Sequence, residues 1–433
     1  MTDALLTYPK TAAEGMSVDF VGRRGALFWL AFKTGFLTIL TLGFYRFWMK
    51  TRLRRWYWSA IRPGGHPMEY VGEPLEKLLG FFIAVVILTF YIGIVNLLLM
   101  FLSFSVFSTA SFGYIASFAG VVPLWFYARY RARRYVLSRT RWRGVRFGLE
   151  KAAWGYTWRA VIHWCVTLVS LGTLWPRMTF HLEKYVTDRT YFGSARLHQD
   201  GHWTMLYRAA IPLIVALLIL ATSTVWMLWF DPIFGSEGLS ISGIAHDILT
   251  DDTVVYSLDK PERLFLVPVA LVGIVYGAIH YRFVSKRLMA GYKSAEGITL
   301  ASRLSGPRVA FIYTFGSFIA YSVLVVGVAG LAIAGLAVFG PSALVFLDIG
   351  LEEASFDIPQ AVALALLVVF YLSIFLLWNV LYNTFVTFPL MRHLAKTTSL
   401  PKRYGLRYVS QRARDEFAEA EGFAEALDVG AAI

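Results

Sequence analysis

The sequence predicts an all-α polytopic membrane protein. Six transmembrane helices form three hairpins, two further segments enter the membrane region without crossing, and small cytoplasmic turns repeat along the chain. Three observations support this fold class. The 433 residues are 57% hydrophobic and only 16% charged, whereas soluble domains usually have about 25% charged residues. Apolar runs near the roughly 20 residues needed to cross a bilayer recur, and the basic residues gather in short segments between them.

Six apolar runs are the expected membrane crossings. They are Leu78–Met100, Phe112–Tyr127, Ile211–Phe230, Leu264–His280, Phe311–Phe339 and Ala361–Phe388. The first 25 residues include Asp3, Glu14 and Asp19 and have no apolar core, so no cleaved signal peptide is expected.

The orientation follows from five short basic segments, which hold 35 of the 41 Lys and Arg residues. These segments are Arg46–Lys77, Arg129–Arg159, Arg177–Arg208, Arg282–Arg308 and Arg392–Arg414. Basic residues near spanning helices favour the cytoplasmic side. By contrast, Asp231–Glu262 has seven acids and one base, and Gly340–Gln360 has no base. We therefore expect the basic segments and both termini inside, and the two acidic loops outside.

Two segments, named the Leu-Gly segments here, do not fit as crossings. Phe28–Trp48 is divided by Lys33, and Ala160–Trp175 is 16 residues long and contains His163. Thr41-Leu42-Gly43 in the first corresponds to Ser170-Leu171-Gly172 in the second, and we expect the two glycines to allow close packing of helix or backbone. A crossing by Ala160–Trp175 would put three basic segments outside. We expect both segments to be re-entrant, sheltered by protein, or to lie at the interface; ordinary short tilted spans are the alternative.

The basic segments resemble one another. Arg-x-Arg-Arg-aromatic occurs at Arg52–Trp56 and Arg131–Tyr135, and a Gly follows each motif nine residues later. Each segment then enters a short alternating run, typical of a half-buried strand. The runs read MEYVG, VRFGL, SARLH, ITLAS and LRYVS. Repeated units usually pack together, so the turns form either one β-layer or five separate juxtamembrane loops.

The repeat divides the chain into five regions. Residues 1–25 form a cytoplasmic tail, and residues 26–159 a first repeat of Leu-Gly segment, basic turn, hairpin and basic turn. Residues 160–308 repeat that order, and residues 309–410 hold the last hairpin and turn. Residues 411–433 form an acidic cytoplasmic tail. Phe417, Ala420, Ala424 and Leu427 form an apolar stripe if the tail is helical, and the tail is a candidate to dock on the basic turns or on a partner helix.

With these motifs the chain resembles the YjgN-like family of uncharacterised bacterial inner-membrane proteins. The likeness rests on TLGFYRFWMKTRLRRWYW, GGHPMEYVGEP, SLGTLWP and RTYFG, and covers about Gly25 to Ser410. The resemblance implies an inner-membrane location and supplies no activity. It also implies a membrane zinc metallopeptidase of the HtpX type as a partner.

Catalytic and metal-binding patterns are scarce in the sequence. His198 and His202 lie four apart, but Gly201 opposes a helix and no Glu lies between them as in a zinc-peptidase helix. Cys165 follows His163 closely, yet its apolar run is typical of a buried, inert thiol. We therefore expect no enzyme, no cofactor, no metal site and no nucleic-acid partner.

Two groups of residues are candidate sites. Arginines beside aromatic residues at the interface attract anionic lipid, and the candidates for headgroup binding are Arg52, Arg54, Arg55, Arg131, Arg133 and Arg134. Polar groups within membrane segments are candidates for function: Lys33, Asn96, His163, Asn379 and Asn383. Hydrogen bonding between helices is the alternative for the Asn residues, and snorkelling is the alternative for Lys33.

These observations favour a non-enzymatic protein that organises anionic lipids or partner proteins at the cytoplasmic face. A transporter or lipid flippase, with a site between the two Leu-Gly segments, is the alternative, because internal repeats and interrupted segments are typical of transporters. The sequence leaves the lipid, the substrate and the oligomeric state open.

Overall fold

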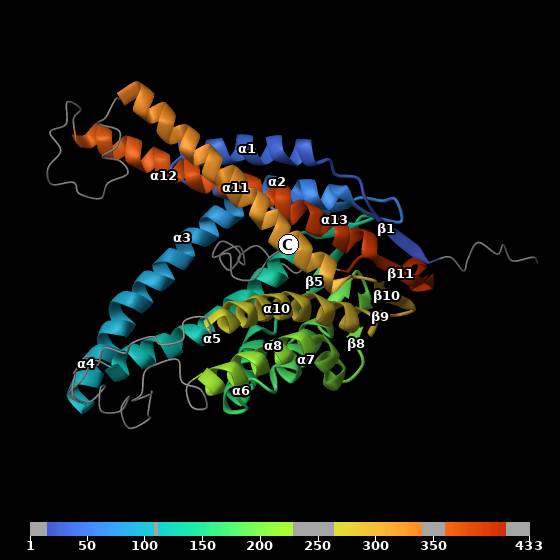
Figure 1. Cartoon of the computed structure of the whole chain (residues 1–433). Helices are drawn as coiled ribbons and strands as arrows, with labels where there is room; N and C mark the ends of the chain where they lie inside the picture. Colours follow the sequence, from blue (N-terminus) through green and yellow to red (C-terminus); the bar gives the residue numbers. More distant parts are fainter. Residues whose placement is uncertain (1–14, 108–110, 228–263, 340–359, 413–433) are drawn as a thin grey trace, which may run out of the picture. The chain divides into compact units, whose positions relative to one another are not determined.

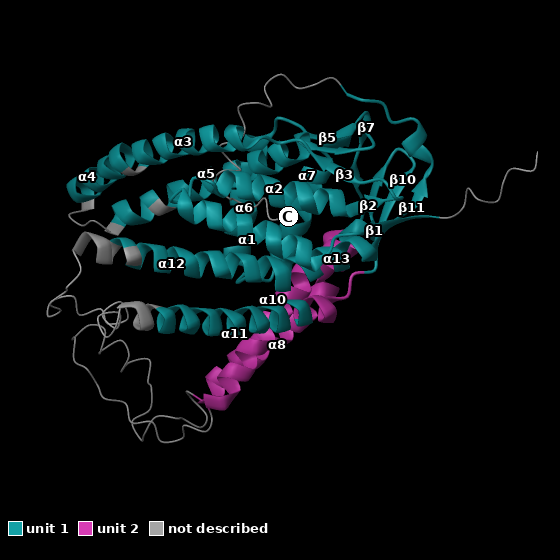
Figure 2. Cartoon of the chain, turned by 90° about the horizontal axis from the view of Figure 1, so that it is seen from above, with its two compact units in different colours: residues 1–201, 289–303, 311–433 teal, residues 202–288, 304–310 magenta. Residues whose placement is uncertain are grey.

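The computed structural model describes residues 15–107, 111–227, 264–339 and 360–412 (Figure 1). The protein is mostly helical, with short strands between the helices. It divides into two compact units: residues 1–201, 289–303 and 311–433 form unit 1, and residues 202–288 and 304–310 form unit 2 (Figure 2).

The first Leu-Gly segment is a helical hairpin. α1 (Arg24–Leu40) and α2 (Arg46–Ala60) pack on each other across a five-residue turn. The Gly43 amide donates to the Thr38 carbonyl at 2.7 Å, and the Leu42 amide to the Ile39 carbonyl at 2.9 Å. These two bonds, with Leu42 at φ 49° and Gly43 at φ 94°, form a Schellman motif, which ends α1. The Thr41 hydroxyl then accepts from the Tyr45 amide.

The second Leu-Gly segment repeats this turn bond for bond. α6 (Ala153–Val169) and α7 (Trp175–Thr187) flank it. The Gly172 amide donates to the Thr167 carbonyl at 2.8 Å, Leu171 has φ 50°, and Gly172 has φ 83°. The Thr167 hydroxyl contacts the Met178 sulfur at 3.9 Å, as Thr38 contacts Met49 at 4.0 Å in the first hairpin. We call these structures the first and second Leu-Gly hairpins.

The remaining helices include the apolar runs that the sequence predicts to cross. They are α3 (Pro74–Phe90), η2 (Tyr91–Val95), α4 (Asn96–Phe107), α5 (Ser111–Ser138), η3 (Trp203–Leu206), α8 (Tyr207–Val225), α10 (Leu266–Ala290), α11 (Gly306–Phe339), α12 (Gln360–Tyr382), η7 (Asn383–Thr387) and α13 (Phe388–Thr397). α3, η2 and α4 form one continuous helix through a π turn.

Five helical stretches in the described part of the chain are long and apolar enough to cross a membrane, by length and composition. They are Pro74–Val106, Trp203–Val225, Leu266–Ala290, Gly306–Ala334 and Leu367–Thr397. The expected crossing Phe112–Tyr127 lies in α5, which is not among them. In α5 a short apolar run is followed by a C-terminal half rich in arginine. The sixth crossing therefore stays a prediction.

The basic turns and the N-terminal tail contain strands that pair with one another in unit 1. The strands are β1 (Met16–Phe20), β2 (Ile61–Pro63), β3 (Met68–Tyr70), β4 (Thr140–Trp142), β5 (Val145–Leu149), β6 (Thr190–Phe192), β7 (Ala195–Arg196), β8 (His198–Gln199), β9 (Lys293–Ala295), β10 (Ile298–Ser302) and β11 (Thr398–Arg403). One sheet has the order β2-β1-β11-β10-β9-β8, and the other β3-β4-β5-β6-β7. Every pairing is antiparallel.

The two sheets are joined at both ends by short connections. β2 leads to β3 through residues 64–67, and β7 leads to β8 through Leu197 alone. The strands therefore follow one another in a closed circuit, which we call the β-circuit. Buried Met16, Trp142 and Phe192, from β1, β4 and β6, share an apolar cluster. The β-circuit thus has its own core, although its strands come from distant parts of the chain.

The fifth turn differs from the sequence expectation. The run LRYVS was expected to be a strand, but β11 lies upstream of it, and residues Tyr404–Arg407 form the 3₁₀ helix η8. Leu406 and Val409 pack on the apolar cluster of the β-circuit. The alternation of LRYVS therefore reflects burial of two side chains by an irregular segment. The tail residues 1–25 also contain a strand, β1, which the sequence did not predict.

The two Leu-Gly hairpins pack against different helices of unit 1. The first shares a buried cluster with Val380 of α12 and with Phe388 and Met391 of α13. The second shares a buried cluster with Phe126 and Tyr130 of α5. Each hairpin therefore packs in its own buried apolar cluster.

Unit 2 contains the close pairing of α8 with α10. A Cβ added at Gly277 of α10 would lie 2.5 Å from the Cα of Leu213, and one at Gly273 would lie 3.1 Å from the Cβ of Ala216. Small residues that allow such close approach are typical of membrane helix pairs.

Candidate anion-binding cleft

A basic cleft of about 420 Å³ lies in unit 1, where α3 begins and α5 ends. The strands β4, β5 and β6 and the segment Gln411–Arg412 complete its walls. Its basic lining residues are Arg134, Arg139, Arg141, Arg146, Lys151 and Arg412. Its acidic lining residues are Glu73, Glu76 and Glu150. Six cations thus face three carboxylates, and the cleft has a net positive charge.

One wall is fixed by the carboxylate of Glu76, in the first turn of α3. The Arg139 guanidinium donates to its two oxygens at 2.6 and 3.2 Å, and the Tyr135 hydroxyl donates at 2.8 Å. The Arg139 side chain is 8% exposed, so this bidentate ion pair is largely desolvated. Glu76 and Arg139 therefore neutralise each other and tie α3 to α5.

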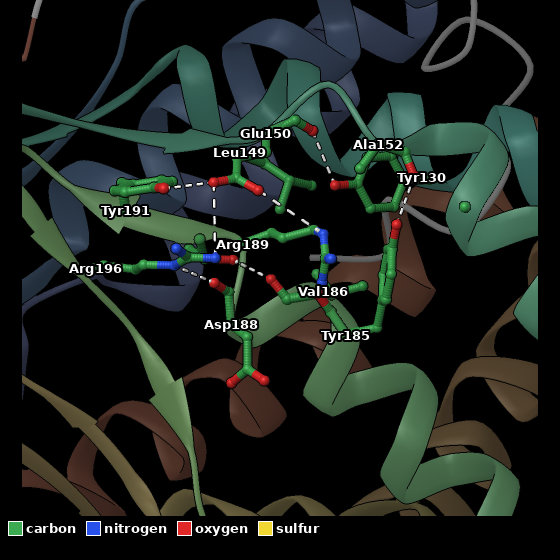
Figure 3. Close-up of polar contacts among 12 residues, drawn as sticks. Tyr130, Leu149, Glu150, Ala152, Tyr185, Val186, Asp188, Arg189, Tyr191 and Arg196 are labelled. Carbon is green, nitrogen blue, oxygen red and sulfur yellow. Dashed lines mark hydrogen bonds and ion pairs between the residues drawn. The ribbon is translucent and has the colours of Figure 1, made fainter.

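A second part of the lining belongs to a network around Glu150 (Figure 3). The Tyr191 hydroxyl donates to the Glu150 carboxylate, and Arg189 and Arg196 each approach it to 3.8 Å. Burial and the hydrogen bond to Glu150 raise the pKa of Tyr191, so its hydroxyl stays a donor at neutral pH. The Glu150 backbone carbonyl accepts from Tyr130 of α5. Arg189 and Arg196 lie outside the lining of the cleft and neutralise part of the charge of Glu150. Glu150 therefore offsets less of the positive charge of the cleft.

Local backbone contacts position the arginines of the cleft. The buried Arg134 donates through Nε to the Leu149 carbonyl at 3.0 Å. Gln411 accepts from the Arg146 amide at 3.0 Å, which brings the C-terminal segment to the cleft. The Arg412 guanidinium then lies 4.4 Å from the centre of the Tyr191 ring, a favourable cation–π distance. Preorganised guanidinium groups of this kind suit phosphate or carboxylate ligands.

The structure separates the six arginines predicted to bind headgroups. Arg134 alone among them lines the cleft. Arg54 is buried against the Tyr70 ring, and Arg55 donates to the Gly72 carbonyl at 2.9 Å. Arg52 is exposed on α2, near Tyr45, and Arg131 donates to Tyr127.

Arg133 belongs to an ion triad outside the cleft. It contacts Glu183 of α7 through two hydrogen bonds of 3.1 and 3.3 Å, and Lys293 of β9 contacts the same carboxylate at 2.7 Å. Burial raises the pKa of Glu183, but the two cations outweigh this and hold it well below its usual range. The triad joins three segments that are distant in sequence, so Arg133 has a structural role.

The predicted intramembrane polar residues do not gather in one place. Asn383 donates to the Asn379 side chain at 2.6 Å, and Asn379 contacts the Met49 sulfur of α2. These contacts fit helix–helix packing. Lys33 is exposed on α1, and the Asn96 carbonyl oxygen has no hydrogen-bond partner among the residues that the structure describes. The His163 ring stacks on His181 of α7, with centroids 5.2 Å apart.

Sequence reasoning missed most of the cleft. Arg139, Arg141 and Arg146 belong to a basic segment that it identified, but nothing singled them out from their neighbours. The one available signal was the strand VRFGL, which places Arg146 in an antiparallel pair with Arg141. Glu76 and Arg412 join them only through the tertiary fold.

The remaining candidate residues from the sequence are His198, His202 and Cys165. No group of three or more His, Cys, Asp or Glu residues there is placed to hold a metal ion. His198 lies in β8, and the His202 ring contacts the Thr204 hydroxyl at 2.9 Å. Cys165 is exposed on α6, so the expectation of a buried thiol was wrong.

The described residues are mostly helical and include five helical stretches long and apolar enough to cross a membrane, which is compatible with a multi-pass membrane protein. The chain belongs to the family described as "Bacterial protein of unknown function (DUF898)", whose model matches residues 16–324. This is the YjgN-like family that its sequence motifs resemble. No curated protein and no solved structure matched the chain.

Proposed function

We propose that this protein is a non-enzymatic organiser of the bacterial inner membrane, which holds anionic lipids and partner proteins at the cytoplasmic face. In this proposal the spans anchor the chain and the β-circuit lies beneath the bilayer, with both termini cytoplasmic. The positive-inside rule supports this orientation, because the strands occur in the basic turns.

The observation that carries the proposal is the exposed apolar tip of each Leu-Gly hairpin. Leu171 is 93% exposed and Val169 87% exposed, and Leu42 is 74% exposed at the matching position. Exposed apolar groups gathered in this way mark interaction surfaces. The turn itself satisfies its backbone through the Schellman bonds, which is required of any non-crossing segment in hydrocarbon. Insertion of both tips into the inner leaflet would cover them.

The hairpin contacts favour an organiser over a transporter. The first hairpin packs on α12 and α13, and the second on α5. A substrate site between the two hairpins, which the transporter alternative requires, would need the hairpins to face each other. The contacts instead give each hairpin a separate partner helix.

Spin labels on single cysteines test the insertion of the tips. In a Cys165→Ala background, Leu171→Cys and Leu42→Cys are labelled in reconstituted vesicles. We expect high accessibility to oxygen and low accessibility to a water-soluble nickel chelate. Ser194→Cys, in the turn between β6 and β7, serves as the aqueous control. Equal nickel accessibility at Leu171 and Ser194 would refute the insertion.

Purification in mild detergent tests the organising role. The wild-type protein is expected to retain anionic lipid above its share of the membrane, together with specific partner proteins. A membrane zinc metallopeptidase is the partner that the family resemblance suggests. Retained lipid of the same composition as the bulk membrane would count against the proposal.

A further inference from the structure

We propose that the basic cleft binds the phosphate group of an anionic phospholipid, which gives the cytoplasmic face one defined lipid site in addition to general attraction. This inference rests on the proposed function and deepens it. The inference is based on the residues that line the cleft and on the position of the cleft at the start of the first spanning helix.

The charge of the cleft selects an anion. Six cationic side chains line it against three carboxylates, and the pairing of Arg139 with Glu76 still leaves five cations against two carboxylates. Guanidinium groups donate in a rigid fork that matches phosphate oxygens. Two of the lining arginines, Arg134 and Arg139, are at least nine-tenths buried. The volume of about 420 Å³ lies within the roughly 300–1,000 Å³ of small-ligand sites.

The position of the cleft favours a lipid over a free anion. Glu76 lines the cleft from the first turn of α3, and the stretch Pro74–Val106 is apolar enough to cross the membrane. Leu79, Ile83 and Val86 follow Glu76 at spacings that keep them on one helical face. Their exposed fractions are 64%, 46% and 68%. A phosphate in the cleft would therefore lie at headgroup depth, with an apolar stripe beside it for an acyl chain.

The segment Gln411–Arg412 contributes to the lining of the cleft. Ser194 and Ser410 exchange hydrogen bonds of 2.9 and 3.1 Å, and Gln411 is held by the Arg146 amide. These contacts place Arg412 beside Tyr191 at the cleft wall. The site thus uses residues from α3, α5, β4, β5, β6 and the end of the described chain, and it exists only in the folded protein.

The test compares two double variants that remove the same charge. Arg141→Gln with Arg146→Gln alters the cleft, at two side chains that are only partly buried. Lys402→Gln with Arg403→Gln alters exposed positions of β11, in the other sheet. The purified full-length proteins, in neutral detergent, are titrated with short-chain phosphatidylglycerol, short-chain phosphatidylcholine and inorganic phosphate.

We expect the wild type to bind phosphatidylglycerol more tightly than phosphatidylcholine. The cleft variant should lose at least about tenfold in affinity for it, since hydrogen bonds to charged groups are each worth about that factor or more. The β11 variant should bind like the wild type, and inorganic phosphate should compete.

Equal losses of affinity in both variants would refute the cleft as the lipid site, although general attraction of anionic lipid to the protein would still hold. If the wild type binds inorganic phosphate but not the lipid, and the cleft variant loses this binding, the ligand of the cleft is a free phosphate and not a phospholipid. No anionic binding by the wild type would overturn the lipid site and the lipid part of the proposed function together.

Discussion

Replacing Glu183 by Gln should destabilise the protein, because this carboxylate joins three separate segments. It pairs with Arg133 of α5 in two hydrogen bonds and with Lys293 of β9 at 2.7 Å. Gln has nearly the same size but no charge, and one of its two terminal atoms is a donor. The variant would therefore leave two cations close together without a counter-charge.

The magnitude follows from the burial of the triad. Breaking a fully buried pair costs about 3–5 kcal/mol, whereas exposed pairs contribute about 0.2–1 kcal/mol. The three side chains are 43%, 23% and 19% exposed, in the order Arg133, Glu183, Lys293. Solvent screening at these exposures reduces the buried value, and we expect a loss of roughly 2 kcal/mol.

The pH dependence has a defined sign. Arg133 and Lys293 lower the pKa of Glu183 below its unfolded value, which is about 4.3 for Glu. The stabilisation is then fully present above the unfolded pKa and is lost progressively as the pH falls through the folded pKa. The wild type and the Glu183→Gln variant should therefore differ at pH 6–8 and converge under acid conditions.

Thermal unfolding in mild detergent measures both effects. Glu183→Gln should lower the midpoint by a few degrees at pH 7, and Glu69→Gln, at an exposed position of β3, serves as the matched control. Equal midpoints for the two variants at pH 7 would refute the reasoning. So would a deficit of Glu183→Gln that is undiminished at low pH, because that result would indicate lost packing in place of lost charge.

Three further predictions test other parts of the structure. Gly43→Ala and Gly172→Ala should each cost about 1 kcal/mol through the positive φ of the turn, whereas Asn, which tolerates that region, should cost less; equal midpoints for Ala and Asn would contradict this. In a Cys165→Ala background, Ser194→Cys should resist an impermeant thiol reagent applied to intact cells, and labelling from outside would refute the cytoplasmic β-circuit. Deleting residues 413–433, which hold six acids and one base directly after Arg412, should tighten the binding of inorganic phosphate, and an unchanged affinity would show that this charge does not reach the cleft.

The Leu-Gly hairpins show which structural features the sequence could predict. The match between Thr41-Leu42-Gly43 and Ser170-Leu171-Gly172 predicted two equivalent structures, and the structure gives both the same turn. The physical reason expected for the glycines was wrong. A Cβ at Gly43 or Gly172 would meet nothing within 4 Å, so close packing does not require them; the left-handed backbone does.

The cleft and the outer regions show where sequence reasoning ends. Arg134, Arg146 and Arg412 share a site because strand pairing and the Ser194–Ser410 contact bring distant segments together, and local patterns contain no record of such pairing. The expected helical stripe of the acidic tail and the two acidic loops, Asp231–Glu262 and Gly340–Gln360, lie wholly or almost wholly outside the described residues. Their predicted locations therefore rest on charge alone.

The β-circuit bears on the choice between organiser and transporter. Strands from all five basic turns pair in the two antiparallel sheets of the β-circuit. Two of them directly follow the last residue of a helix, since β2 follows α2 and β11 follows α13. Alternating access usually requires one group of helices to rock against another. Here, displacement of a helix end would pull its strand from its neighbours and expose unpaired backbone groups, each of which costs about as much as a lost hydrogen bond. The circuit therefore opposes large relative motion of these helix ends and suits a protein that holds lipid and partner sites in fixed positions.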